Sequence, residues 1–357
     1  MKKFLIINPF GIGDVLFTTP VIRSIKENFP ASQVGYWCNE RVGDILDDNP
    51  CIDKVFALSR GDLKRISGYS RMQGLRRSWG LFCAIKKGRF DISLDFSLEH
   101  RYSLISKLAG VKKRVGFNYR KRGKFLTDNL EVSGYQDKHV VEYYLGLLDL
   151  IGVKPELTPR LELFVADEAK FKVRALFKDL GIENKGPLIG IAPGAGASWG
   201  KDAGYKHWPA EKFAQVTDKI SKDFGARALI LGDGKERQLA ERIMEASSSK
   251  PLDLSGKISL KELAAVIEGL DLLIANDGGP LHMAVALGVK TVSIFGPVDE
   301  LVYGPYPASA KHIVIKNDLD CRPCYQDFRF KGCDNNRLCL EGISVDQVYQ
   351  KARSLMQ

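Results

Sequence analysis

A short polar turn after an apolar segment is the clearest candidate for a chemical role in this sequence. Residues 272–275 (LLIA) predict a buried parallel strand, and residues 276–282 (NDGGPLH) follow it directly. The turn holds Asp277, Gly278 and Gly279. A glycine turn that opens a helix presents unpaired N–H groups, which bind anions, and His282 lies one turn further on as a possible donor. The turn predicts a diphosphate site, although an ordinary strand-to-helix turn with an Asp cap has the same residues.

A second glycine turn follows the first apolar segment. Residues 3–7 predict a strand, and residues 11–14 (GIGD) open the next helix. A dinucleotide fingerprint would need a third glycine where Leu16 stands, so the dehydrogenase interpretation is weak. Asp14 could deprotonate an acceptor hydroxyl, or it could simply cap the helix, and the sequence alone favours neither.

Two further charged residues follow predicted strands in the second half of the chain. Lys206 comes just before a helix whose first turn contains Pro209, where a cation can neutralise a leaving diphosphate. Glu236 follows the apolar residues 227–231 and could accept hydrogen bonds from a ribose diol. A solvated acid at a helix start is the alternative for Glu236.

These turns need strands and helices to position them, and the chain predicts both in alternation. Strand-like segments recur in each half, and a proline-containing connector at 153–187 separates the halves. The predicted strands are 34–38, 55–58, 92–96, 114–117, 188–192, 227–231, 270–275, 291–295 and 312–315. Strands that alternate with helices indicate parallel sheets, whose ligands lie beyond the carboxyl ends of the strands. We therefore expect an α/β protein of two open domains facing a cleft.

Composition and charge narrow the function classes. The chain has 357 residues with 45% hydrophobic and 27% charged residues, which is ordinary for a globular protein and leads us to expect a cytoplasmic one without a membrane span. The net charge is +10, but nine Lys or Arg fall within 60–89 against one acid, and nine more within 101–124 against none. Such a basic half suits phosphorylated or carboxylated partners, anionic lipid or nucleic acid. A nucleic-acid-binding motif is absent.

Four of the seven cysteines gather near the C-terminus. They are Cys321, Cys324, Cys333 and Cys339. The first two have the spacing of ligands to tetrahedral zinc or iron. A structural metal and a set of reduced structural thiols both remain open, whereas disulfides are disfavoured in the cytoplasm.

Taken together, these motifs resemble glycosyltransferase family 9, the ADP-heptose:lipopolysaccharide heptosyltransferases. The resemblance covers nearly the whole chain and includes GDVL at 13–16, RVGF at 114–117, KHWP at 206–209, NDGGPLH at 276–282, FGP at 295–297 and CRPC at 321–324. It implies the GT-B fold of two Rossmann-like doubly wound domains around a central cleft, an inverting mechanism and no divalent metal in catalysis. Some related autotransporter heptosyltransferases carry a four-cysteine iron site in this region.

The resemblance also implies roles for individual residues. Asp14 matches the general base, and Lys206 matches the lysine near the donor phosphates. Glu236 corresponds to the ribose-binding acid and Ile258 to the adenine pocket. The remaining donor-binding positions are Gly13, Asp277, Gly278, Gly279 and His282. Gly278 departs from the family pattern, since many members carry a hydroxyl residue there.

The resulting hypothesis is an inverting transfer of heptose from ADP-heptose to the inner core of lipopolysaccharide, at the inner face of the inner membrane. Residues 1–165 would bind the acidic acceptor and residues 166–342 the nucleotide sugar, and residues 343–357 would form a helix that could cross back to the first domain. Another nucleotide sugar or a protein acceptor is the main alternative. A sugar epimerase or a nucleic-acid-binding module is less favoured.

Overall fold

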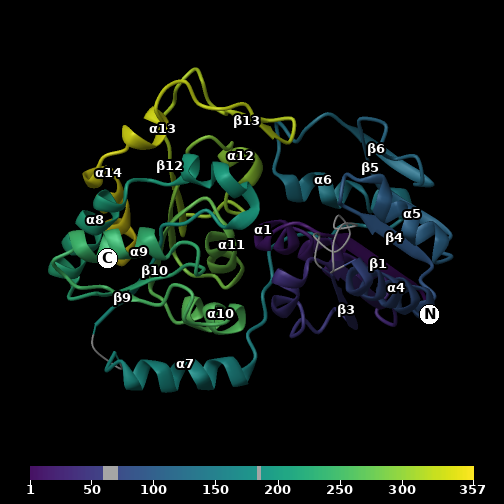
Figure 1. Ribbon diagram of the computed structural model, residues 1–357, viewed down its shortest axis with the longest axis horizontal. Coiled ribbons are helices and arrows are strands. Elements are labelled where there is room, and N and C mark those ends of the chain that lie inside the picture. The colour runs from purple at the N-terminus through teal and green to yellow at the C-terminus, as the bar shows by residue number, and fades with distance from the viewer. Residues whose placement is uncertain (59–70, 183–185) are drawn as a thin grey trace. The chain divides into compact units, whose positions relative to one another are not determined.

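Each half of the chain builds its own parallel sheet in the computed structural model, which describes residues 1–58, 71–182 and 186–357. The contacts divide the chain into two compact units, Met1–Glu162 and Leu163–Gln357 (Figure 1). Each unit contains a six-stranded sheet whose described pairs are all parallel. The prediction of an α/β protein with two Rossmann-like domains is confirmed.

The first unit has the strand order β3-β2-β1-β4-β5-β6. Its strands are β1 (Lys3–Asn8), β2 (Gln33–Cys38), β3 (Lys54–Ala57), β4 (Ile92–Asp95), β5 (Lys113–Tyr119) and β6 (Asp128–Val132). Its helices are α1 (Ile12–Leu16), α2 (Thr19–Asn28), η1 (Glu40–Ile45), α4 (Arg71–Gly88), α5 (His100–Leu108), α6 (Val140–Gly146) and η2 (Asp149–Ile151). The central strand β1 is almost entirely buried, as its run of apolar residues requires.

The first predicted helix is divided into α1 and α2 at residues 17 and 18. Pro20 has no N–H, so it cannot donate to the carbonyl of Leu16 as a continuous helix would require. The hydroxyl of Thr19 donates to that carbonyl instead, at 2.7 Å. A short first helix therefore ends close to Asp14, and α2 begins independently with its proline in the first turn.

The second unit has the strand order β12-β11-β10-β7-β8-β9. Its strands are β7 (Leu188–Ala192), β8 (Arg227–Ile230), β9 (Leu252–Asp253), β10 (Leu272–Asn276), β11 (Thr291–Ile294) and β12 (His312–Ile315). Its helices are α7 (Asp167–Asp179), η3 (Ala197–Lys206), α8 (Ala210–Phe224), α9 (Arg237–Ala246), α10 (Leu260–Glu268), α11 (Gly279–Ala286), α12 (Glu300–Tyr303), α13 (Leu338–Glu341) and α14 (Val345–Met356). A two-stranded hairpin, β13 (Tyr325–Gln326) and β14 (Arg329–Phe330), lies outside the sheet.

Two edge strands were not predicted. β6 has a sequence of alternating exposure, DNLEV, and β9 has only two residues. An edge strand is held by a single neighbour, so little of its pattern is apolar, and its pairing is decided by the strand beside it. The central strands are predicted correctly because they are buried on both faces, which leaves a continuous apolar run in the sequence.

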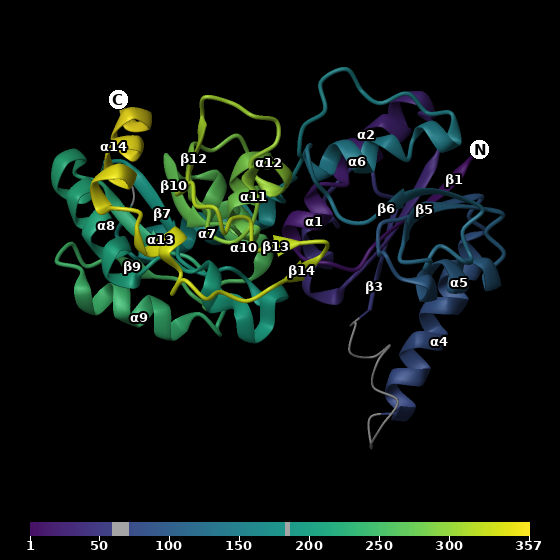
Figure 2. The same cartoon turned by 90° about the horizontal axis from the view of Figure 1, so that it is seen from above.

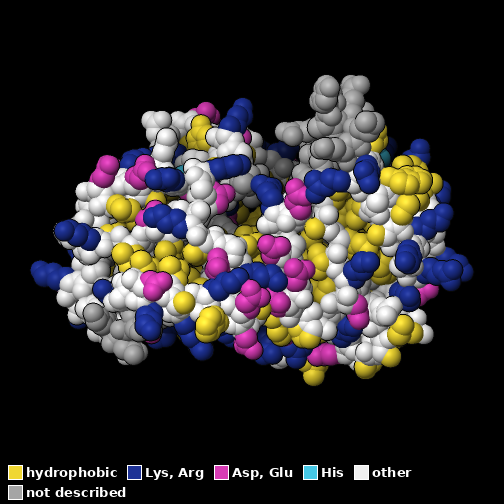
Figure 3. All heavy atoms as spheres, turned by 60° about the horizontal axis from the view of Figure 1, so that its bottom comes forward, with side chains coloured by type: hydrophobic (Ala, Val, Ile, Leu, Met, Phe, Trp, Pro, Cys, Tyr) yellow, Lys and Arg dark blue, Asp and Glu magenta, His cyan; other side chains and the backbone are white. Residues whose placement is uncertain are grey.

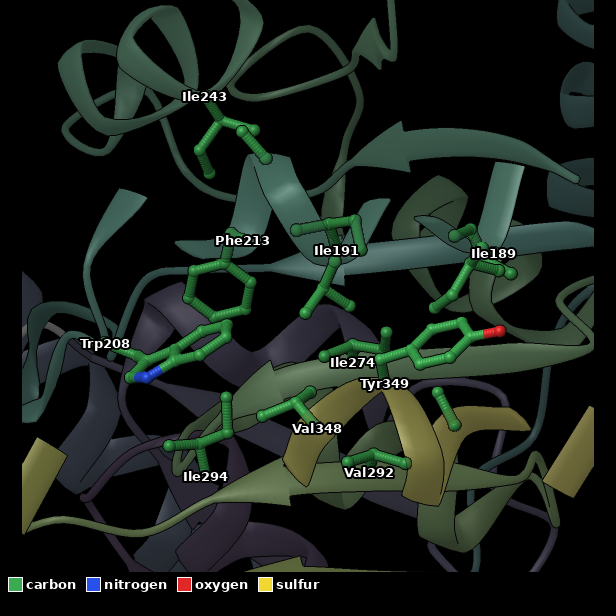
Figure 4. Packing of buried hydrophobic residues seen from close by; sticks show 14 of the residues in the cluster. Ile189, Ile191, Trp208, Phe213, Ile243, Ile274, Val292, Ile294, Val348 and Tyr349 are labelled. Atoms are coloured by element: carbon green, nitrogen blue, oxygen red, sulfur yellow. The ribbon is translucent and has the colours of Figure 1, made fainter. Parts of the chain in front are cut away.

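The C-terminal helix α14 belongs to the core of the second unit. It packs against α8 and against β10, β11 and β12. Val348 and Tyr349 enter the same buried cluster as Ile274, Val292 and Ile294 (Figure 4). The apolar face of α14 therefore packs within the second unit.

No helix in the described part of the chain is both long and apolar enough to span a bilayer.

Candidate functional site

The turn after β10 is held in place by Asn276, which ends the strand and is buried. Its amide nitrogen donates to the carbonyl of Pro193 at 2.5 Å, and its amide oxygen accepts from the N–H of Trp208 at 3.2 Å. One side chain thus ties together the segments that follow β10 and β7 and the start of α8. These hydrogen bonds fix the loops relative to one another, and loops that are rigid before binding lose little entropy when they bind a ligand.

Asp277, Lys206 and His282 form a shielded polar group beside this turn. The ammonium of Lys206 lies 2.5 Å from the carboxylate of Asp277, and each side chain is 8% exposed. The imidazole Nε2 of His282 lies 3.9 Å from the other carboxylate oxygen. The sequence places Lys206 seventy-one residues before Asp277, and the structure brings the two together.

His282 is neutral at physiological pH. Burial lowers its pKa to about 4, with Asp277 acting to raise it and Lys206 to lower it. A neutral imidazole can still donate one hydrogen bond, but it brings no positive charge to the turn. The cationic groups available here are therefore Lys206 and the N-terminal end of α11.

Gly278 has an extended backbone, with φ −178° and ψ −179°, and lies immediately before α11. A Cβ atom added to it would lie 3.5 Å from the Cα of Ala195, which is an ordinary van der Waals distance. The site can therefore accommodate a side chain at this position. Neither the backbone conformation nor the available space requires glycine here. Compared with the expected hydroxyl residue, Gly278 simply lacks a side-chain hydroxyl.

Glu236 lies in a pocket lined by glycines. Its carboxylate accepts from the N–H of Gly196 at 3.1 Å and from the N–H of Asp233 at 3.0 Å. A Cβ on Gly194 would lie only 1.8 Å from a carboxylate oxygen, so no larger residue fits there without moving Glu236. Burial raises the pKa of Glu236, whereas the backbone donors lower it. The acid is a built feature of the loop and not a solvated helix start.

Ile258 is half-buried and directly precedes Ser259, which caps α10 by accepting from the N–H of Glu262 at 3.2 Å. The loop before it is joined to the loop after β8, because the N–H of Gly256 donates to the carbonyl of Gly232 at 3.0 Å. The loops that carry Glu236 and Ile258 are consequently neighbours.

The strand order explains why these residues gather. β7, the first strand of this sheet, lies between β8 and β10, so successive connections run in opposite directions from it. Such a switch point leaves a crevice at the carboxyl ends of the strands, where ligands of open α/β sheets bind. The loops after β10, β7, β8 and β9 carry the polar group, the glycine pocket and Ile258, and all of them leave that edge.

The first unit has a corresponding switch point between β1 and β4. Asp14 lies there in α1, half-exposed, next to Gly13. Its carboxylate accepts from the N–H of Gly11 at 3.1 Å, and its carbonyl accepts from the amide of Asn8 at 2.9 Å. The helix-capping role is thus present in the structure.

Asp95 is a candidate that the sequence analysis missed. It ends β4 opposite Ile7 in β1, at the same edge as Asp14, and is 5% exposed. Burial raises its pKa to about 7, and the hydrogen bond from Ser97, whose N–H lies 2.9 Å from the carboxylate, acts against this. An acid at the end of a predicted strand could have marked Asp95 as a candidate. The sequence does not show, however, that this strand pairs with β1, and only that pairing places Asp95 at the same edge as Asp14.

Trp199 is a second missed residue. It lies in η3 and its ring faces Lys206, whose ammonium is 5.1 Å from the ring centroid. The ring also contacts Tyr325 at 5.3 Å and Phe330 at 5.0 Å in the β13–β14 hairpin. An aromatic wall therefore lines one side of the shielded lysine, with a cation–π contact to it.

The four clustered cysteines are free thiols, as are the other three. The thiol of Cys324 donates to the carbonyl of Cys321 at 3.0 Å, and the thiol of Cys333 accepts from the N–H of Arg337 at 3.3 Å. Burial chiefly raises the pKa of Cys339 to about 11, and the other three thiols act in the same direction. Within the described residues, no group of three or more His, Cys, Asp or Glu is placed to hold a metal ion. As they stand, the thiols are close enough to interact but do not fit a metal.

Comparison with known proteins gives consistent matches. Residues 78–332 match the family described as glycosyltransferase family 9 (heptosyltransferase). The chain is 27% identical to lipooligosaccharide heptosyltransferase 2 of Campylobacter jejuni over all of this chain and 99% of that protein. It superposes on a glycosyl transferase family 9 crystal structure from Veillonella parvula with a TM-score of 0.82, at 24% identity, covering 99% of this chain and 97% of the other. For ADP-heptose lps heptosyltransferase II of E. coli the TM-score is 0.77 at 20% identity, covering 100% and 98%.

Proposed function

Since the chain belongs to glycosyltransferase family 9, we propose that it transfers a heptose from ADP-heptose to the inner core of lipopolysaccharide. Its enzyme class, a glycosyltransferase, follows from the family. The relatives are named heptosyltransferases of lipopolysaccharide or lipooligosaccharide, and the chain matches most or all of their length. These names support heptose as the transferred sugar and lipopolysaccharide as the acceptor.

The observation that carries the proposal is the shielded Lys206–Asp277 pair at the start of α11. The donor's diphosphate would meet the ammonium of Lys206, the amides of Gly278 and Gly279, and a hydrogen bond from neutral His282. These groups would stabilise the negative charge that develops on the departing ADP. Glu236, held in its glycine pocket, would accept from the ribose hydroxyls, and Ile258 would contact the adenine.

The acceptor step would use Asp14. Its carboxylate takes the proton of the acceptor hydroxyl while the hydroxyl oxygen forms a bond to the anomeric carbon of the heptose. The bond from that carbon to the ADP oxygen breaks on the opposite face, through a transition state resembling an oxocarbenium ion, and ADP leaves with the bonding electrons. Attack from the opposite face inverts the anomeric configuration. No divalent cation takes part in this proposal.

A donor panel tests the proposal. Purified enzyme is supplied with lipopolysaccharide lacking inner-core heptose and with ADP-heptose, ADP-glucose, UDP-glucose or GDP-mannose, and both free nucleotide and acceptor mass are measured. We expect nucleotide release and a mass increase of one heptose with ADP-heptose only. Transfer from another donor would exclude the proposed sugar. Release without any gain in acceptor mass, together with transfer to added protein, would exclude the lipopolysaccharide acceptor.

We also propose that the enzyme works in the cytoplasm at the inner face of the inner membrane, where an acidic acceptor would be reached. The basic surplus in the first half supports attraction to such a surface, which added salt should weaken. Residues 60–70 of the stretch 60–89 lie outside the described residues. The second stretch, 101–124, is described and carries exposed cations along α5 and around β5.

A structural zinc or iron at Cys321, Cys324, Cys333 and Cys339 is a separate proposal with no role in the reaction. It would require the thiols to move from their present positions and to lose their protons, because metals bind thiolates. Elemental analysis of purified protein tests it directly. A stoichiometry near zero in protein made with added zinc and iron would remove the metal and leave reduced thiols.

A further inference from the structure

Helix α4 carries an apolar stripe, Leu75, Trp79 and Phe82, whose first two side chains are mostly exposed. Leu75 is 61% exposed and Trp79 is 66% exposed, although both are large hydrophobic residues. With Phe82 they are spaced i, i+4 and i+7, which places them along one side of the helix. The rings of Trp79 and Phe82 are in contact, with centroids 5.4 Å apart.

An adjoining side of α4 holds the helix to the rest of the first unit. Ile85 is buried in a core cluster with Trp37 and Tyr102, and Leu81 packs against the same cluster. Phe82 is partly buried and packs against this cluster as well, whereas Leu75 and Trp79 face outward. Figure 2 shows α4 extending away from the sheet of the first unit.

Cations flank the apolar stripe. Arg76, Lys86 and Lys87 are exposed, and the ammonium of Lys86 lies 6.0 Å from the ring centroid of Phe82. Residues 71–89 contain six Lys or Arg and no acid. On the neighbouring helix α5, Leu108 is 61% exposed and follows the exposed Lys107. In Figure 3, yellow hydrophobic side chains and dark blue Lys and Arg side chains lie close together on the right of the view, in the first unit.

We propose that α4 docks on an anionic lipid bilayer, with Leu75 and Trp79 entering the interface and Arg76, Lys86 and Lys87 meeting the headgroups. Tryptophan is favoured at such interfaces because its ring is apolar and its N–H is polar. Exposed aromatic and aliphatic residues beside clustered cations are the composition of interfacial helices. Nucleic acid would pair with the cations but would give Leu75 no partner. The biological purpose of this docking rests on the proposed function, since docking would bring the enzyme to an acceptor held in the membrane.

The first experiment needs no variant. Full-length protein is mixed with vesicles of phosphatidylethanolamine and phosphatidylglycerol, or with phosphatidylcholine alone, and flotation is measured. Quenching of tryptophan fluorescence by brominated lipid is then recorded. Trp37 and Trp208 are buried, so quenching reports mainly on Trp79 and Trp199. We expect flotation with the anionic vesicles only, and quenching that disappears in Trp79→Ser.

Variants then distinguish binding through the apolar stripe of α4 from nonspecific binding to vesicles. Leu75→Ser with Trp79→Ser should weaken vesicle binding about tenfold. Phe171→Ser is the matched control, because Phe171 is 72% exposed on α7, where charges of both signs surround it. Arg76→Glu with Lys87→Glu should weaken binding about 20-fold or more, and the control pair Lys172→Glu with Arg237→Glu should change it little.

Vesicle binding requires neither donor nor acceptor, so this test is independent of the proposed reaction. The α4 variants should keep wild-type turnover on a lipid-free acceptor, and their thermal unfolding should match the wild type. Equal binding to neutral and anionic vesicles, or α4 variants that bind like their controls, would overturn the docking surface. Binding to RNA without binding to vesicles would overturn it as well.

Discussion

The ammonium of Lys206 lies 2.5 Å from the carboxylate of Asp277, and both side chains are almost completely shielded from water. A cation left alone in such a place would lose its hydration without compensation. Asp277 therefore holds Lys206 at the start of α11, next to the amides of the glycine turn. This pair links Lys206, which precedes α8, to the turn that follows β10, and it places the positive charge of the Lys206 ammonium beside that turn.

The Lys206–Asp277 pair should be visible as a coupling energy. Lys206→Met or Asp277→Asn alone should each lower the free energy of unfolding by about 3–5 kcal/mol, because each leaves the other group buried without its partner. The double variant should lose clearly less than the sum of the two. Urea unfolding of all four proteins, followed by tryptophan fluorescence, measures this coupling, and strict additivity would contradict it.

The same pair predicts a difference in function between Lys and Arg. Lys206→Arg keeps the charge but presents a planar, forked group on a longer side chain, where the structure has a compact ammonium against Trp199. We expect a fall in turnover of about tenfold, against about 100-fold or more for Lys206→Met. Steady-state rates of ADP release distinguish these values. Equal rates for Lys206→Met and wild type would remove Lys206 from the reaction.

Acid should destabilise the protein partly through His282. Its folded pKa of about 4 lies below the ordinary 6.5, so the unfolded chain takes up a proton in this interval while the folded chain does not. Stability is therefore complete above about pH 6.5 and is lost as the pH falls towards 4. The pKa difference corresponds to about 3 kcal/mol at most.

Urea unfolding at several pH values from 7 to 4.5 tests this, with His282→Gln expected to flatten the pH dependence. His312 is the comparison, because burial also lowers its pKa to about 4 and it lies in β12, outside the turn. His312→Gln should flatten the stability curve as well, but it should leave the pH dependence of ADP-heptose binding unchanged. A His282→Gln curve that follows the wild type would show that His282 titrates normally.

Gly278→Ser should improve donor binding. The backbone is extended there, and a Cβ would make only an ordinary contact with Ala195. A hydroxyl at this point could donate to a phosphate, and one additional hydrogen bond would lower the donor KM about three- to tenfold. The matched control is Gly194→Ser, where a Cβ would collide with Glu236, and this variant should lose both stability and donor binding. A higher donor KM in Gly278→Ser would show that the turn cannot use a hydroxyl.

Asp14 has two possible roles that one pair of substitutions separates. Asp14→Asn keeps an oxygen that can accept from the N–H of Gly11, so it preserves the cap but removes the base. Asp14→Ala removes both. We expect turnover to fall by about 10²–10⁴-fold in both variants, with donor binding retained, and stability to fall by about 1 kcal/mol in Asp14→Ala only.

Asp95→Asn should be measured beside the Asp14 variants. Asp95 lies at the same strand edge and has a pKa raised to about 7, so it is the group that could replace Asp14 as a base. We expect its loss to change turnover far less than the loss of Asp14. A turnover of Asp14→Asn close to wild type, together with a large fall in Asp95→Asn, would assign the proton transfer to Asp95.

Much of the candidate site followed from local sequence patterns. The turn at Asp277–Gly279 and the acid Asp14 each follow a strongly apolar strand directly, so the strand itself identifies which end of the sheet they occupy. Asp95 and Trp199 were missed because their importance depends on neighbours that are distant in the sequence. β4 pairs with β1, and Trp199 meets Lys206 together with the β13–β14 hairpin.

The sequence by itself determined the alternation of strands and helices, the two halves and the polar turns at strand ends, since burial of central strands leaves an unambiguous apolar pattern. Tertiary structure decided which turns are neighbours, because strand order is set by pairing and crossover and not by position in the chain. It paired Lys206 with Asp277, enclosed Glu236 among glycines and directed α14 into the second unit. It also left Trp79 exposed on α4, since a helix's pattern does not specify which of its apolar residues the sheet will cover.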